Sequence, residues 1–434
     1  MRFFKDLVLT GGVVFICLLG LEAAMRAGGL KYTGSFYVYD PIRLYALRPG
    51  ATGWVEGEGE SYMAINSDGM HDREHTLGKP SGTVRVAFMG DSETNAEHLP
   101  FDENMVQLAQ KELQRDPGHV ELLNFAVGGY TLAEQIYTFR DHAAKYQPDI
   151  VILMLSPVII RASKRELNTF ESPSPSFILR GGHLVPDPLS PALRAPDPRW
   201  LAVRNHLAQL QNDIRVLALI REATQTGLRQ KLPQIRALFG GSAAAAASQT
   251  NCPCGPPSSE KMEEAWQISA ALIERLNETV QAHNARLWIV SLGDGSQIIP
   301  NPEVRRSTER RYGTTDIEYA DRRMGAIATR LGIGFLPVAP ALLDYAVQRH
   351  LALRGSDRTP PYVGHLNREG HRAMGPILAD FIRAALHQPL HAPALLQNSN
   401  LREISADAKD RSAERYGVAI SPIAAGTNFT TEYN

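Results

Sequence analysis

The sequence predicts an α/β fold in three layers, in which about five parallel strands form a sheet with helices on both faces. Five short apolar runs, each about the length of a strand, alternate with longer segments whose apolar residues recur at helical spacing. Such alternation is typical of a parallel sheet covered on both sides, where ligands bind at the carboxyl ends of the strands. An uncharged N-terminal stretch adds a transmembrane helix to this domain, and a helical insertion interrupts it.

The composition narrows the function classes. The chain has 434 residues, enough for one large domain with an insertion and a tail. Lys and Arg number 45 against 46 for Asp and Glu, so no net field attracts nucleic acid, and we expect no nucleic-acid partner. The three cysteines lack the spacing of zinc ligands, and we expect neither a metal nor a cofactor.

The N-terminal segment, residues 1–27, is expected to be a single-pass membrane anchor. Arg2 and Lys5 precede an uncharged stretch from Leu7 to Leu21. At about 1.5 Å per residue, this stretch and its apolar flanks suffice to cross a hydrocarbon core about 30 Å thick. We expect it in the inner membrane with the body of the protein on the periplasmic side. A cleaved signal peptide is the alternative, although no clean small-x-small cleavage pattern follows the stretch.

The domain itself is expected over residues 81–386, after an extended lead-in over residues 28–80. The five strands are expected at Val84–Met89, Val120–Phe125, Asp149–Leu155, Arg286–Leu292 and Ile333–Val338. Helical spacing is found at Met105–Arg115, Thr131–Tyr146, Glu260–Asn284, Asp316–Leu331, Pro340–Leu351 and Arg368–Leu386.

Two regions depart from the alternation. Residues from about 162 to 258 form an insertion between the third and fourth strands, with an amphipathic helical part over Trp200–Lys231. The insertion is either a lid or membrane-facing flap, or a peripheral helical excursion. Residues 387–434 are polar and without periodicity, and are expected to be disordered.

Ser92 is the candidate nucleophile because of its position. It follows the first predicted strand through Gly90 and Asp91, in a tight strand-to-helix turn. A serine hydroxyl needs a base to remove its proton and nearby amide hydrogens to stabilise the oxyanion, and such a turn can supply these conditions. A Gly-Asp-Ser sequence elsewhere would indicate only an ordinary turn.

Four segments give this turn its context. They are Ile65–Glu74 (INSDGMHDRE), Val86–Ser92 (VAFMGDS), Asn124–Tyr130 (NFAVGGY) and His365–His371 (HLNREGH). In order and spacing they resemble the sequence blocks of the SGNH/GDSL hydrolase superfamily, in particular its membrane-anchored members. The resemblance covers about residues 55–160 and 260–386, and it implies a flavodoxin-like sheet and a serine esterase.

The resemblance also implies roles for individual residues. Ser92 corresponds to the nucleophile and to one backbone donor of the oxyanion hole, and Gly129 corresponds to the second donor. His365 corresponds to the general base. The orienting acid, which in many members lies three residues before the base, is replaced here by Tyr362. Asp357 is the nearest upstream carboxylate and the candidate acid, unless a backbone carbonyl holds the imidazole and leaves a Ser-His dyad.

A second departure concerns the third oxyanion donor. Members of the superfamily place an asparagine after the third strand, where this chain reads Ser156-Pro157. Loss of one oxyanion donor costs about 2.7 to 4 kcal/mol of transition-state stabilisation, which is a hundred- to thousandfold in rate. This departure affects the expected activity and leaves the expected fold unchanged.

The resulting hypothesis is an esterase that forms an acyl-enzyme at Ser92, with His365 as its base, on an acylated glycan or small ester. By analogy with the superfamily, O-acetyl esters of an envelope polysaccharide are the expected substrates. One alternative is an O-acetyltransferase that passes the same acyl group to a sugar hydroxyl. The other is a weakly active or inactive protein that binds polysaccharide or acts as a scaffold in its biosynthesis.

Overall fold

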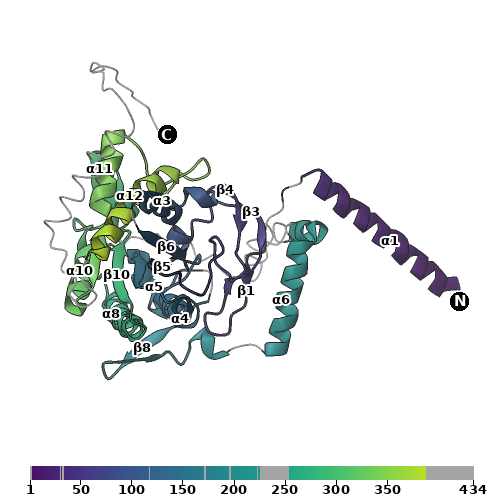
Figure 1. Cartoon of the computed structure of the whole chain (residues 1–434), viewed down its shortest axis with the longest axis horizontal. Helices are drawn as coiled ribbons and strands as arrows, with labels where there is room; N and C mark the ends of the chain where they lie inside the picture. Colours follow the sequence, from purple (N-terminus) through teal and green to yellow (C-terminus); the bar gives the residue numbers. More distant parts are fainter. Residues whose placement is uncertain are drawn as a thin grey trace, which may run out of the picture. The chain divides into compact units, whose positions relative to one another are not determined.

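The computed structural model describes residues 2–29, 31, 34–116, 118–170, 173–194, 197–221, 223–224 and 254–387. Its centre is a five-stranded parallel sheet in the order β11-β10-β7-β5-β6 (Figure 1). The strands are β5 (Thr83–Met89), β6 (His119–Asn124), β7 (Ile150–Leu155), β10 (Arg286–Ser291) and β11 (Gly334–Pro337). The predicted sheet is confirmed, with each strand within two residues of its expected bounds.

Helices cover both faces of this sheet. α3 (Met105–Leu113), α11 (Ala339–Arg349) and α12 (Arg368–Leu386) pack together, while α4 (Leu132–Asp141), α5 (Pro157–Ala162), α8 (Glu260–Ala282) and α10 (Tyr319–Leu331) form the other layer. Alternate strand residues face the two layers. Ala87 and Met89 of β5 belong to the core that contains Trp266 of α8, whereas Trp288 of β10 packs against Phe381 of α12 at 4.9 Å between ring centroids. The predicted three-layer fold class is therefore confirmed.

The lead-in before the sheet contains two small antiparallel sheets. β1 (Tyr37–Val38) pairs with β2 (Ala46–Leu47), and β3 (Thr52–Glu56) pairs with β4 (Glu60–Ala64). Buried Phe36, Leu47 and Met63 form a separate cluster with Tyr130, which follows β6 in the main domain. This cluster fixes the β3–β4 hairpin against the carboxyl ends of the sheet strands.

The insertion is partly helical, as expected, and begins with an element that was not expected. β8 (Phe177–Arg180) and β9 (His183–Pro186) form a hairpin ahead of α6 (Pro198–Asp213). Within the predicted range Trp200–Lys231, α6 ends at Asp213, because Ile214 has an extended backbone. Much of the remaining insertion, and the tail predicted after residue 387, lie outside the described residues.

Shorter elements connect these parts. They are the helices α2 (Ser92–Asn95) and α9 (Pro302–Tyr312) and the 3-10 turns η1 (Phe101–Glu103), η2 (Ala143–Tyr146), η3 (Arg165–Leu167), η4 (Pro191–Arg194) and η5 (Gly295–Ile298). The N-terminal helix α1 (Arg2–Ala27) contains a 24-residue stretch, Phe4–Ala27, of mean hydropathy 2.2. By length and composition it fits a membrane span, and a signal sequence fits the same description.

Candidate active site

Ser92 lies at the carboxyl end of β5, as the first residue of α2. The turn is tight because a Cβ atom at Gly90 would lie 2.5 Å from the Thr94 hydroxyl oxygen. Asp91 caps α2, and its carboxylate accepts a hydrogen bond of 3.0 Å from the Glu93 backbone N–H. Burial raises the pKa of Asp91 to about 6. This turn holds the Ser92 side chain at the edge of the sheet where parallel folds bind ligands.

His365 lies in hydrogen-bond contact with Ser92. The His365 Nε2 atom is 2.7 Å from the Ser92 Oγ atom, across 273 residues of sequence. His365 itself stands just before α12, whose first turn is capped by the Asn367 side chain through a 3.1 Å bond from the Gly370 backbone N–H. The structure therefore brings together the two residues that the sequence assigns as nucleophile and base.

The carboxylate beside His365 belongs to Glu58, at the tip of the β3–β4 hairpin. Glu58 Oε1 lies 3.0 Å from His365 Nδ1, and Glu58 Oε2 accepts a 2.7 Å hydrogen bond from the His365 backbone N–H. This close approach depends on Gly364, whose φ is +82° and whose added Cβ would lie 2.6 Å from the Glu58 carboxylate. An acceptor at Nδ1 places the proton there and leaves Nε2 free to accept the Ser92 proton.

The assignment of Asp357 as the acid is therefore corrected. The described structure places no hydrogen bond or ion pair between Asp357 and His365, and Glu58 occupies Nδ1 instead. Tyr362, which replaces the acid of the family pattern, has a left-handed backbone with φ of 71° in the loop before His365. The Ser-His dyad considered from the sequence does not describe this geometry either, since a carboxylate contacts the base.

The electrostatic surroundings favour a charged His365. Burial alone would lower its pKa, but the hydrogen bond to Glu58, together with the charges of Glu93, Glu58 and Asp91, raises the pKa of His365 to about 9. In turn, burial would raise the pKa of Glu58, and the hydrogen bonds to His365 lower it. The imidazolium that forms when His365 accepts a proton is thus well stabilised at this site.

A buried ion pair holds the His365 segment from both sides. Arg354 pairs with Glu93, and the same guanidinium donates a 2.7 Å hydrogen bond to the Gly364 carbonyl. The other Glu93 oxygen accepts a 3.0 Å bond from the Leu366 backbone N–H. Although burial raises the pKa of Glu93, the Arg354 charge lowers it to about 2, so the pair stays ionised. The residues before and after His365 are thereby tied to the turn that presents the nucleophile.

The other histidine of the last block has a different position. His371 is buried in α12, and its Nδ1 atom accepts a 3.0 Å hydrogen bond from the Met105 backbone N–H at the start of α3. Burial lowers the pKa of His371 to about 3, so it remains neutral. This contact joins α12 to α3 and gives His371 a structural place outside the Ser92–His365 contact.

Two residues at the cavity beside Ser92 have backbone amides that are free to donate a hydrogen bond. Ser92 and Gly129 both line the cavity at the nucleophile, and neither backbone N–H donates a hydrogen bond to another described residue. Gly129 has a φ of +79°, and an added Cβ would lie 2.8 Å from the Tyr45 hydroxyl oxygen. Ser156, in the place of the asparagine of the superfamily pattern, is buried at the N-cap position of α5, where its side chain makes no capping hydrogen bond, and it does not line this cavity. Of the three oxyanion donors of the superfamily pattern, the two backbone amides therefore remain at this cavity among the described residues.

The cavity at Ser92 has a volume of about 570 Å³ and walls from three parts of the chain. The turn that contains Ser92 and the segment Asn124–Tyr130 supply one wall, the β1–β2 lead-in a second, and the insertion the third. Its lining residues are Tyr37, Tyr39, Leu44, Tyr45, Ser92, Glu97, Gly128, Gly129, Pro173, Pro191 and Arg204. The cavity therefore combines aromatic side chains with a few polar groups.

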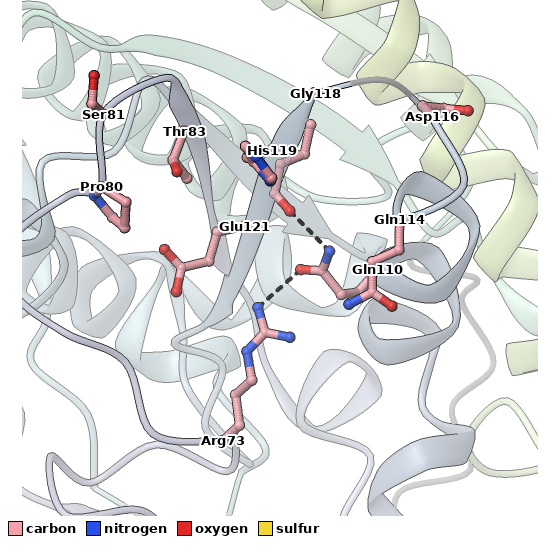
Figure 2. A pocket seen from close by; sticks show the side chains of 11 residues that line it. Arg73, Pro80, Ser81, Thr83, Gln110, Gln114, Asp116, Gly118, His119 and Glu121 are labelled. Carbon is pink, nitrogen blue, oxygen red and sulfur yellow. Dashed lines mark hydrogen bonds between the residues drawn. The ribbon is translucent and has the colours of Figure 1, made fainter.

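A second cavity, of about 600 Å³, lies at the opposite end of the sheet strands from Ser92 (Figure 2). Thr83 and His119, the first residues of β5 and β6, line it, so it is at the amino ends of the strands. Figure 2 shows Arg73 pointing toward Gln110, whose side-chain oxygen accepts a 3.1 Å hydrogen bond from it. The Gln110 amide nitrogen donates a 2.9 Å bond to the Val120 carbonyl. None of the Ser92, His365 and Glu58 side chains lines this cavity.

Comparisons with known proteins concern the fold. No protein-family model matches the sequence, and no curated protein matches it. Similar solved structures include the acetyl xylan esterase AlAXEase, at 16% identity and a TM-score of 0.34, covering 70% of this chain and 100% of that one. Esterase EstA from Pseudoalteromonas sp. matches at 13% identity and a TM-score of 0.34, covering 70% of this chain and 99% of that one. A catalytic mutant of Axe2, an acetylxylan esterase from Geobacillus stearothermophilus, matches at 12% identity and a TM-score of 0.33, covering 69% of this chain and 93% of that one.

Proposed function

We propose that this chain is a serine ester hydrolase in which Glu58, His365 and Ser92 form a catalytic triad. The observation that supports it most is the continuous relay of contacts, 3.0 Å from Glu58 to His365 Nδ1 and 2.7 Å from His365 Nε2 to Ser92 Oγ. Each distance lies within or at the edge of hydrogen-bond reach, which proton transfer requires. An inactive scaffold has no need of this relay, and the relay therefore favours an enzyme.

The proposed reaction proceeds through an acyl-enzyme. Ser92 Oγ attacks the ester carbonyl carbon while its proton passes to His365 Nε2, and the backbone N–H groups of Ser92 and Gly129 bind the developing oxyanion. The bond to the alcohol then breaks, and that alcohol leaves with the proton from His365. Water next attacks the acyl carbon, His365 accepts its proton and returns it to Ser92 Oγ, and the carboxylic acid leaves.

The proposed substrates are O-acyl, in particular O-acetyl, esters of a polysaccharide on the exported side of the membrane. The tyrosine-lined cavity supports a sugar-bearing substrate, and α1 supports attachment to a membrane if it is retained as an anchor. Transfer of the same acyl group to a sugar hydroxyl remains the alternative outcome, because both reactions share the acyl-enzyme.

Labelling with a fluorophosphonate probe tests the nucleophile. We expect labelling of the wild-type protein and of the control Ser81→Ala, an exposed serine at the far edge of the sheet, and no labelling of Ser92→Ala. Equal labelling of Ser92→Ala and wild type would refute the proposal. Acetate release from an acetylated oligosaccharide, with and without a second glycan as acceptor, then distinguishes hydrolysis from transfer.

A further inference from the structure

Arg204 is placed at the Ser92 cavity by a specific contact of the insertion with the lead-in. The neighbouring Asn205 side chain accepts a 3.2 Å hydrogen bond from the Tyr39 backbone N–H and donates a 3.5 Å bond to the Tyr39 carbonyl. This two-way pairing fixes α6 against the residue that follows β1. As a result, Arg204, the residue before Asn205 in α6, lines the cavity that contains Ser92.

The Arg204 guanidinium has no hydrogen bond or ion pair with any described residue. It is exposed, and although Glu97 also lines the cavity, the two do not form an ion pair. Glu97 instead accepts a 3.0 Å hydrogen bond from the Tyr37 hydroxyl. A guanidinium offers five N–H donors in a planar fork that matches a carboxylate, and this fork is unused here.

A second group of the cavity also lacks a partner. The Tyr39 hydroxyl is buried and makes no hydrogen bond within the described part of the chain, although Tyr39 lines the cavity. A buried hydroxyl without a hydrogen-bond partner destabilises the fold unless a ligand or a water molecule bonds to it. The cavity therefore combines a free cation, an unsatisfied hydroxyl and the rings of Tyr37 and Tyr45, all beside Ser92.

We infer that this enzyme recognises an O-acylated glycan that carries a carboxylate, such as a uronic-acid polymer, and that Arg204 binds the carboxylate. The inference rests on the proposed function, since the same cavity must place the ester at Ser92. In this arrangement the tyrosine rings pack against the sugar, and the guanidinium pairs with the carboxylate through two charge-assisted hydrogen bonds. Glu97 would repel a carboxylate on its own side of the cavity, so the charge of the sugar is directed toward α6.

The test compares two substrates that differ only at the carboxylate. The first is an acetylated oligogalacturonate, and the second is the same oligosaccharide reduced to neutral galactose units before acetylation. We expect the wild type to prefer the uronate in kcat/KM, with a preference that falls as salt rises. Arg204→Ala should lower kcat/KM on the uronate by about tenfold to a hundredfold, mainly through KM, and lower kcat/KM on the neutral substrate much less, so that the uronate preference is lost.

Controls separate this inference from the proposed function. Arg199→Ala removes the same charge from the same exposed helix outside the cavity and should retain the uronate preference, while Arg204→Lys should retain part of it. The melting temperature should be the same in all three variants, and hydrolysis of p-nitrophenyl acetate should be unchanged in Arg199→Ala. If p-nitrophenyl acetate is cleaved at Ser92 but the wild type shows no uronate preference, or Arg204→Ala loses activity equally on both glycans, only the inference is overturned. Absence of any Ser92-dependent cleavage would overturn the proposed function itself.

Discussion

Replacing Glu58 with glutamine should move the pH dependence of ester hydrolysis to lower pH. With a pKa of about 9, only about one His365 in a hundred is neutral at pH 7, and the neutral form is the one that accepts the Ser92 proton. The wild-type kcat/KM should therefore rise about tenfold per pH unit from pH 7 and level off above pH 9. Glu58→Gln removes the nearest opposing charge, so burial then acts against the protonated ring and the rise should occur at lower pH.

The size of the effect follows from the same contact. A pKa raised from 6.5 to about 9 corresponds to about 3.4 kcal/mol at 1.36 kcal/mol per pH unit. This is an upper bound for Glu58, because Glu93 and Asp91 contribute and because the His365 side chain is 32% exposed, which screens the charges. The plateau should also fall, by up to about ten-thousandfold, since a neutral amide at Nδ1 no longer enforces the productive tautomer.

The assay is p-nitrophenyl acetate hydrolysis from pH 5 to 10, corrected by the rate with Ser92→Ala. Glu56→Gln, at the exposed end of the same hairpin, is the matched control and should retain the wild-type profile. The melting temperature offers an independent measurement. Because the pKa of His365 is raised on folding, its protonation stabilises the folded protein fully below pH 6.5, and this stabilisation is lost as pH rises through about 9. An identical pH profile in Glu58→Gln and wild type would refute the role of Glu58.

Two further substitutions test the support of the triad. Gly364→Ala should lower the esterase activity by more than tenfold, because the added Cβ displaces Glu58. The control Gly332→Ala has the same left-handed backbone but nothing within 4 Å of its added Cβ. It should lower only the free energy of unfolding in urea, by about 1 to 2 kcal/mol. Equal activity losses in the two variants would contradict this. Glu93→Gln should destabilise the protein by about 3 to 5 kcal/mol, because it leaves the buried Arg354 charge without its partner. An unchanged free energy of unfolding in urea at pH 7 would contradict a stabilising role for the Arg354–Glu93 ion pair.

The sheet and the Ser92–His365 pair could be predicted from sequence because their signals are local. Each strand is a short apolar run, and each of the two residues lies in a motif of a few positions whose order is informative. Glu58 is different, since 307 residues separate it from His365 and its own surroundings, Gly57-Glu58-Gly59, indicate only a hairpin turn. Nothing along the chain connects that turn to His365, and the nearest upstream carboxylate in the sequence is that of Asp357.

The β8–β9 hairpin of the insertion has a recognisable sequence signal. Gly181-Gly182 separates two short runs, Phe177–Arg180 and His183–Pro186, and two glycines in this position are a recognised hairpin signal. The end of α6 at Asp213 is harder to anticipate, because the amphipathic spacing continues beyond it. The position of Arg204 could not be predicted from the sequence, since α6 is joined to the lead-in by a pairing of Asn205 with Tyr39, which lie 166 residues apart.

The location of Glu58 on a hairpin that precedes the sheet has a practical consequence for recombinant work. A polypeptide trimmed to begin at residue 81 would retain the nucleophile, base and last-helix motifs yet lose the carboxylate that contacts His365 Nδ1. Kinetics measured on such a truncated protein would describe the Ser-His pair alone and would not test the proposed triad. Any version intended for assay should therefore start upstream of Thr52, where β3 begins.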